Sequence, residues 1–147
     1  MTGCPTCGKG GKRRSVDQHR RYFAMCKLAF DNWPEAHEFQ PDSAEHLRKW
    51  LQVKAGYRTV SEIDVARTDP RSIMIMEATL RAAMKATADY GWTVQHGKRL
   101  YVIASRSIAF DKISHGEFCT LNDMVAEVIE RECGISIDDL MKETVAA

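Results

Sequence analysis

The chain has 147 residues, 44% of them hydrophobic and 28% charged, and its 21 basic and 20 acidic residues leave a formal net charge of +1. Such a chain is too apolar and too nearly neutral to be disordered, so we expect one globular domain. No uncharged apolar stretch approaches the roughly 20 residues of a membrane-spanning helix, and the first residues lack the apolar core of a signal peptide. The five cysteines, an odd number, favour thiols or metal ligands over disulfides and a reducing, cytoplasmic location.

The charges are unevenly distributed along the chain. Six cations and one acid lie between Lys9 and Arg21, a local charge of +5, whereas eight acids and two bases from Glu117 onward give −6. Binding follows the local potential within about 8 Å at physiological salt. The basic segment therefore predicts an anionic partner, and the alternative is a solvated tail that keeps the protein soluble.

Two amphipathic helices are predicted first. Residues 1–13, rich in Cys, Gly and Lys, are expected to form an arm or a zinc knuckle ahead of a domain spanning 14–147. Helical spacing of apolar residues predicts a helix over 16–32 with Ser15 as its N-cap. A second helix is predicted between the cap Ser43 and Gly56. Its exposed side is expected to carry Glu45, His46, Arg48, Lys49 and Lys54.

The middle of the chain predicts an extended segment and a third helix. β-Branched residues in 57–65 favour a short strand. Asp69-Pro70 has the pattern of an N-cap followed by proline in the first helical turn, and predicts a helix to about Asp89. Its packed face is expected to contain Ile73, Met76, Leu80, Ala83 and Met84.

The last third predicts a hairpin and two helices. Residues 92–103 have the pattern of a β-hairpin that turns around His96-Gly97. Ser114 and Glu117 form a capping-box signature for a helix that stops at Gly134, and Ser136 caps a short final helix. The predicted fold is α+β, a single compact domain, mainly helical with a small antiparallel sheet.

Motifs of catalysis are scarce. The sequence has no Walker loop, no G-x-S-x-G, no H-E-x-x-H and no G-x-G-x-x-G. The acids Glu117, Asp123 and Glu127 are spaced as ordinary surface residues of a helix, so a metal-dependent nuclease is the weakest hypothesis. We therefore expect a protein that is not an enzyme.

Cys4-Pro5-Thr6-Cys7-Gly8 is the sharpest chemical signal. A C-x-x-C-G turn points two thiolates at one zinc ion, which takes four ligands. His19 lies at a spacing comparable with zinc fingers, so we expect Zn²⁺ on Cys4, Cys7 and His19. Other candidates for the missing ligands are Cys26, Cys119, Cys133, His37 and His46. A redox-active C-x-x-C and an arm without function stay open, and Cys26, Cys119 and Cys133 are expected in the core.

Basic residues beside aromatic ones predict contact with single-stranded nucleic acid. Cations can track the phosphates while aromatic rings stack on bases. Trp50 lies among Arg48, Lys49 and Lys54, although a tryptophan in an amphipathic pattern is usually a core residue. The predicted DNA-binding residues are Lys12, Arg13, Arg14, Gln18, Arg20, Arg21, Arg48, Lys49, Trp50 and Lys54.

Several stretches resemble known phage proteins. Arg14-Ser15-Val16-Asp17-Gln18-His19-Arg20 resembles the R-S-x-D-Q-N-R segment of the NinB (Orf) family of lambdoid phage recombination proteins, with His19 in place of asparagine. Residues 102–107 and the later Gly116-Glu117-Phe118 resemble that family's strand, serine turn and G-E-F helix. The stretches 19–33, 39–57 and 107–118 resemble still more closely a related phage family of uncharacterised function.

The NinB resemblance implies a homodimeric α+β protein that prefers single-stranded DNA to duplex. It also implies contact with the host single-stranded-DNA-binding protein and help in loading a recombinase, in the cytoplasm of a bacterial host. Residues that carry over from the family motifs are Arg14, Asp17, Gln18, Arg20, Ser107, Glu117 and Phe118. The leading hypothesis is thus a non-catalytic accessory protein of phage recombination. The alternative is a phage protein that binds and modulates a host protein, such as a defence-system inhibitor, without DNA.

Overall fold

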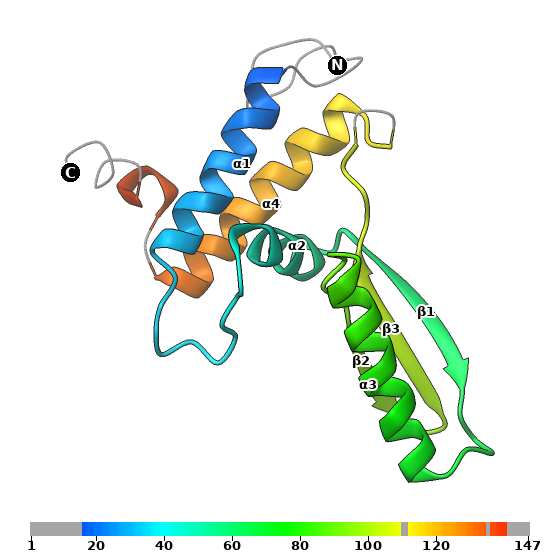
Figure 1. Ribbon diagram of the computed structural model, residues 1–147. Helices are drawn as coiled ribbons and strands as arrows, with labels where there is room; N and C mark the ends of the chain where they lie inside the picture. Colours follow the sequence, from blue (N-terminus) through cyan, green and yellow to red (C-terminus); the bar gives the residue numbers. More distant parts are fainter. Residues whose placement is uncertain (1–15, 110–111, 135, 141–147) are drawn as a thin grey trace.

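The computed structural model describes residues 16–109, 112–134 and 136–140. Helices α1, α2 and α4 pack together, and α3 projects from them with a three-stranded sheet (Figure 1). The predicted α+β architecture is confirmed. In chain order the elements are α1 (Val16–Asp31), α2 (Ala44–Lys54), β1 (Arg58–Asp64), α3 (Pro70–Ala86), β2 (Trp92–His96), β3 (Arg99–Ser105) and α4 (His115–Cys133), followed by a helical turn at 137–140.

Side-chain caps set the helix starts where the sequence predicted them. The side chains of Ser43, Asp69 and Ser114 each accept a hydrogen bond from the backbone N–H three residues later, at 3.0 to 3.2 Å. These bonds satisfy N–H groups that have no partner within the helix. Gly134 ends α4 in the left-handed conformation, with φ 72°. Ser15, the predicted cap of α1, lies outside the described residues.

The main core lies between α1, α2 and α4. Tyr22, Leu47, Leu51, Phe118 and Ile129 have exposed fractions of 1% or less. A smaller core lies between α3 and the sheet, where Ile73 and Leu100 are buried. Ala83, predicted on the packed face of α3, is exposed, so that prediction is wrong. The sheet is narrow, and it covers only a stripe of α3.

The sheet has the order β1-β3-β2 with antiparallel neighbours. The predicted hairpin is confirmed: β2 and β3 are joined by Gly97 and Lys98, and Gly97 has φ 61°, a value that suits glycine in such a turn. β1 pairs with β3 along its whole length, from Arg58 opposite Ser105 to Asp64 opposite Arg99. β3 is therefore the central strand, and its end leads into the segment that approaches α1 and α2.

An aromatic cluster anchors the loop between α1 and α2. The Trp50 ring stacks on Phe39, with centroids 4.5 Å apart, and meets Trp33 edge to face at 5.7 Å. The Trp33 indole N–H donates to the Phe39 carbonyl at 2.8 Å. Trp50 is 8% exposed, so its ring has no face left for a nucleic-acid base and we withdraw it from the predicted DNA contacts. No described helix has both the length and the apolar character to cross a membrane.

His46 extends this cluster towards the turn after α3. Its ring stacks on Tyr90 with centroids 4.4 Å apart, and its Nδ1 accepts a hydrogen bond from the Asp42 N–H at 3.0 Å. Burial lowers the pKa of His46 below 6.5, Lys85 lowers it further, and Asp42 opposes the shift. A protonated Nδ1 could no longer accept from the Asp42 N–H.

We expect the stability of the protein to fall in acid partly because of His46. The lowered pKa means that the unfolded chain binds this proton more tightly than the folded one. The loss of stability therefore begins as the pH falls below about 6.5. It grows until the pH reaches the lower pKa that His46 has in the folded protein. Thermal melts at pH 7.5 and 5.0 should show a smaller decrease in Tm for His46→Asn than for the wild type. An equal decrease in both proteins would contradict this role of His46.

Candidate functional site

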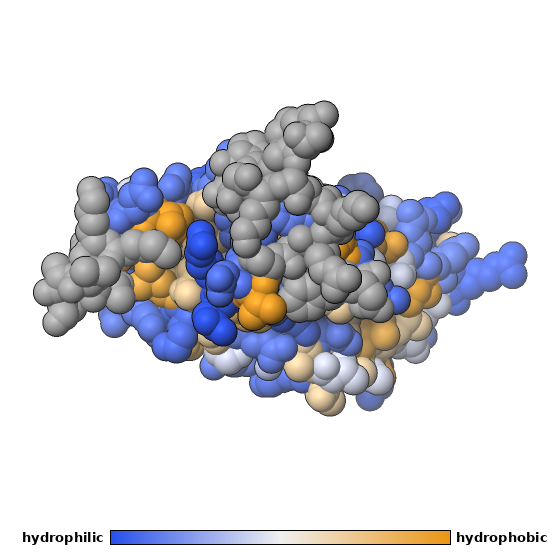
Figure 2. Space-filling view, turned by 90° about the horizontal axis from the view of Figure 1, so that it is seen from above, coloured by the Kyte–Doolittle hydropathy of each residue, from blue (hydrophilic) through white to orange (hydrophobic). Residues whose placement is uncertain are grey.

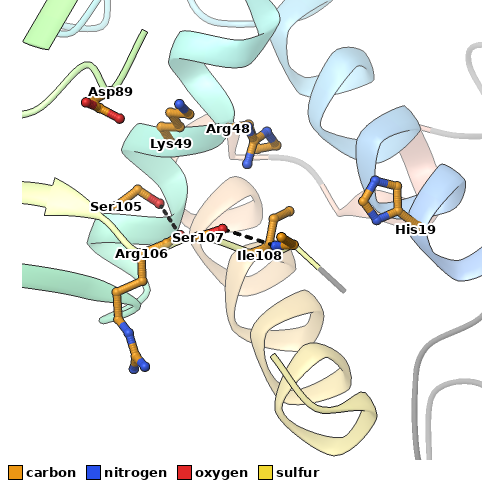
Figure 3. A pocket seen from close by; sticks show the side chains of 9 residues that line it. His19, Arg48, Lys49, Asp89, Ser105, Arg106, Ser107 and Ile108 are labelled. Atoms are coloured by element: carbon orange, nitrogen blue, oxygen red, sulfur yellow. Dashed lines mark hydrogen bonds between the residues drawn. The ribbon is translucent and has the colours of Figure 1, made fainter. Parts of the chain in front are cut away.

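A pocket of about 350 Å³ lies where α1, α2 and the segment after β3 meet (Figure 3). Three separate parts of the chain contribute basic side chains to it: α1 gives His19, α2 gives Arg48 and Lys49, and the segment after β3 gives Arg106. Asp89 is the one acidic residue among those that line it. With His19 neutral the lining carries three cations and one anion. The remaining lining residues are Ser105, Ser107, Ile108 and Ala109.

Arg48 is buried in the wall of this pocket. It is 8% exposed, and its Cζ lies 4.8 Å from the centroid of the Phe23 ring. Its Nη1 donates to Gln52 Oε1 at 2.9 Å, and its Nη2 lies 3.7 Å from Glu45 Oε1. The predicted exposure of Arg48 is wrong because both α1 and the end of β3 approach α2, leaving little of α2 open to solvent. Its Nε is a buried donor with no hydrogen-bond partner among the described residues.

Gln52 connects the three parts of the chain behind the pocket. It has no exposed surface, and its Oε1 accepts from the Tyr22 hydroxyl of α1 at 2.8 Å as well as from Arg48. Its Nε2 donates to the hydroxyl of Ser105 and, at 3.4 Å, to the carbonyl of Arg106. Such a network fixes the positions of all its members. The sequence offered no signal for Gln52, because a single glutamine in a helix has the pattern of a surface residue.

The other cations are held less tightly. The Lys49 ammonium donates to the Ala88 carbonyl and lies 3.7 Å from Glu45 Oε1. Arg106 is exposed, with its Cζ 4.9 Å from the centroid of the Tyr57 ring. In Figure 3 the Arg106 side chain points away from His19 and Lys49. Arg106, Ser105 and Asp89 were missed at the sequence level, because only the fold brings the end of β3 and the turn after α3 to α2.

The remaining predicted DNA contacts fall into three groups. Arg20 and Arg21 are exposed on α1, and Lys54 is exposed on α2 with its ammonium 5.2 Å from the Trp50 ring. Gln18 is 8% exposed and its Nε2 donates to the Cys119 sulfur at 3.7 Å, so we withdraw it as a DNA contact. Lys12, Arg13 and Arg14 lie outside the described residues.

The side of the molecule where α1 begins is largely polar. Viewed from that side, the surface outside the grey atoms is mostly hydrophilic, with separate hydrophobic patches (Figure 2). The exposed Arg20 and Arg21 belong to the first turns of α1, as does the pocket residue His19. The exposed cations Arg20 and Arg21 thus follow the pocket residue His19 directly along α1.

The predicted zinc ligands are divided between the described and the undescribed parts of the chain. Cys4 and Cys7 lie outside the described residues. The His19 ring lies against Phe23 at 4.5 Å and Phe118 at 6.3 Å, and it lines the pocket. The described residues contain no group of three or more metal-ligating side chains. Zinc on Cys4, Cys7 and His19 therefore stays a prediction.

The three described cysteines differ in state. Cys26 is buried, as predicted, and burial raises the pKa of its thiol to about 12, so it is protonated at neutral pH. Cys133 is half-buried and is a free thiol. Burial raises the pKa of this thiol, and the negative charge of Glu132 raises it further by a smaller amount. Cys119 is 4% exposed, and it is disulfide-bonded. Its assignment to the core is confirmed, but it is not an inert thiol.

Comparison with known proteins assigns no family to this chain. No protein-family model, no curated protein and no solved structure matches this chain.

Proposed function

We propose that the protein binds single-stranded DNA without catalysing a reaction, and that phosphate groups of the strand occupy the pocket. The observation that carries this proposal is the unpartnered Nε donor of the buried Arg48, in a pocket with two further cations and one acid. A buried donor without a partner is costly, and a phosphate oxygen would satisfy it.

The pocket is organised for an oxyanion before a ligand arrives. The Arg48 guanidinium is held by Gln52 Oε1 and by the Phe23 ring, so little side-chain entropy is lost on binding. Arginine presents its donors in a fixed fork that fits phosphate oxygens. Lys49 adds a second cation, and the hydroxyls of Ser105 and Ser107 can donate hydrogen bonds.

The surroundings favour a single strand over a duplex. A pocket of about 350 Å³ has the size of a site for a small ligand or one nucleotide group. At its edge the Arg106 guanidinium lies over the Tyr57 ring, a combination of cation and aromatic plane that single-strand binders use. Arg20 and Arg21 would neutralise phosphates further along the strand.

The phage resemblance supports the same function. The pocket joins residues from all three stretches that resemble the related phage family: His19, the pair Arg48 and Lys49, and Ser107. We accordingly propose an accessory role in phage recombination, as a homodimer in the bacterial cytoplasm that also contacts the host single-stranded-DNA-binding protein. The acidic C-terminal region would face the dimer interface or that host protein.

We expect the double variant Lys49→Ala/Arg106→Ala to bind single-stranded DNA at least about tenfold more weakly at 0.1 M salt. The slope of log K against log salt is negative, and each lost phosphate contact should make it shallower by about 0.7. The double variant should therefore show a slope that is shallower by about 1.4. Fluorescence anisotropy of a labelled single-stranded oligonucleotide at several salt concentrations measures both quantities. A labelled duplex of the same sequence tests the preference for single strands.

The matched control is Arg67→Ala/Arg71→Ala. It removes the same charge from two exposed positions, one in the loop before α3 and one in the first turn of α3, at the far end of the projecting sheet (Figure 1). We expect this control to keep most of the affinity and of the salt slope. Equal losses in both double variants would show that only net charge matters and would remove the pocket from the proposal. No binding of the wild type at low salt would contradict the function itself and favour a host-protein partner.

A further inference from the structure

Strand β1 forms an outer edge of the projecting sheet, and no described strand lies on its other side (Figure 1). Its seven residues are exposed, except that Ile63 is partly buried in the small core below α3. α3 instead reaches the opposite edge of the sheet, where Arg81 donates to the Thr93 hydroxyl of β2 at 3.1 Å. β1 therefore presents the length of a whole strand to a partner.

The backbone of β1 directs hydrogen-bonding groups towards this edge. The Val65 N–H donates to the Lys98 carbonyl at 2.9 Å, and the Arg106 N–H donates to the Tyr57 carbonyl at 3.3 Å. Between these two bonds, residues that bond to β3 alternate with residues whose N–H and C=O groups point outwards. The residues with outward groups are Arg58, Val60, Glu62 and Asp64.

This edge lacks the usual protection against another strand. Soluble proteins block an exposed edge with proline, lysine, a bulge or a very short strand. β1 contains neither proline nor lysine, and its register with β3 runs without a bulge from Arg58 to Asp64. Its one cation is at the start and its acids, Glu62 and Asp64, are near the end. An antiparallel copy of the same strand would place opposite charges together, whereas a parallel copy would place like charges together.

The side chains indicate the register of such a pairing. Val60 lies on the sheet face away from α3, because side chains alternate along a strand and Ile63 packs towards α3. On that face Val60 is opposite Ile103, which is in turn opposite Trp92. This apolar row ends at the edge of the sheet with Val60, which is 51% exposed. A second valine beside Val60 would continue the row.

We propose that two copies of this chain pair antiparallel through β1, with Val60 on the two-fold axis. The two three-stranded sheets then join into one, and the apolar row crosses both. Arg58 of each copy lies opposite Glu62 of the other, a cross-strand pair of opposite charges. The sheet projects from the helical core, so the two cores lie at opposite ends of the joined sheet (Figure 1). This gives a surface to the homodimer of the proposed function, on which it rests.

Sedimentation equilibrium of the full-length protein, without DNA and with a reducing agent, tests this interface. We expect the wild type to have the mass of two chains of 16.6 kDa. Val60→Lys places two ammonium groups opposite each other on the axis and should weaken the dimer at least about tenfold. The matched control Val94→Lys replaces a valine of 45% exposure on the same sheet face, in the other edge strand, and should keep the wild-type dimer. Circular dichroism verifies that both variants are folded.

An exchange of charges tests the register. Arg58→Glu would place an acid opposite Glu62, and Glu62→Arg would place a cation opposite Arg58, so each variant alone should be mainly monomeric. An equimolar mixture of the two variants should recover dimers, because each acid then faces a cation. If the mixture stays monomeric, the proposed register is wrong.

The outcomes separate this surface from the rest of the proposed function. A Val60→Lys protein that dimerises as tightly as the wild type would place the interface elsewhere and leave the homodimer intact. A wild type that stays monomeric at about 0.1 mM would contradict both the surface and the homodimer. The anisotropy measurements with the pocket variants test DNA binding independently of either result.

Discussion

Replacing Gln52 with alanine is expected to lower the free energy of unfolding by about 3 kcal/mol. Gln52 has no exposed surface, and its Oε1 accepts from both the Tyr22 hydroxyl and the Arg48 guanidinium. Removal of the amide leaves a hydroxyl and a charged group buried without this acceptor, and each such loss costs about 1 to 3 kcal/mol. The cavity left by the side chain adds to the cost. Urea denaturation followed by circular dichroism measures the change.

The same substitution should weaken DNA binding under conditions where the variant is still folded. Gln52 holds Arg48 on one side and Ser105 and Arg106 on the other, and all three line the pocket. The control is Gln95→Ala, which removes an exposed glutamine from β2 and should change stability by no more than about 0.5 kcal/mol. In a Tyr22→Phe background the cost of Gln52→Ala should be smaller, because the hydroxyl that would lose its Gln52 acceptor is absent. A loss below about 1 kcal/mol for Gln52→Ala would mean that the network contributes little.

Gly91→Ala is the second substitution for which we expect a large effect, about 3 kcal/mol of destabilisation. A Cβ at this position would lie 2.4 Å from the Ile103 carbonyl oxygen and 2.4 Å from the Met84 sulfur. The methionine can move, but the carbonyl belongs to the backbone of the central strand β3, where Ile103 pairs with Trp92. The added methyl group must therefore push β2 away from β3 at the start of the strand.

Gly116→Ala is the matched control for Gly91. No atom lies within 4 Å of a Cβ at this position, which is in the first turn of α4. Alanine is preferred over glycine in a helix by up to about 1 kcal/mol, so we expect this variant to be as stable as the wild type or slightly more stable. Urea denaturation of both variants gives the comparison. Equal stability of Gly91→Ala and the wild type would show that β2 can shift without cost.

The local elements could be predicted from the sequence because their signals lie within a few residues. Ser43, Asp69 and Ser114 are caps that act on the N–H three positions later, and Gly97 and Gly134 adopt conformations that favour glycine. The pairing of β1 with β3 is different, since the partners are about forty residues apart and no local pattern records it.

The candidate site likewise combines features that could be predicted from the sequence with features that could not. Lys49 was predicted as a nucleic-acid contact from its basic neighbours, and it lines the pocket. The burial of Arg48 and Trp50 was not predicted, because α2 is covered on more than one side by α1, the loop before α2 and the end of β3. A helical pattern specifies which residues share a face, but the number of elements that pack on that helix decides how many faces are buried.

The sequence by itself determined the α+β class, the helix starts, the hairpin turn and the basic character of α1 and α2, since each depends on residues close together in the chain. Only the tertiary structure decided that Gln52 is a buried junction and that Arg106 and Ser107 meet Arg48 and His19 in one pocket. Helix and turn preferences are local interactions of the backbone, whereas a pocket or a buried junction requires packing between distant segments. That packing depends on the shapes of all the side chains at once.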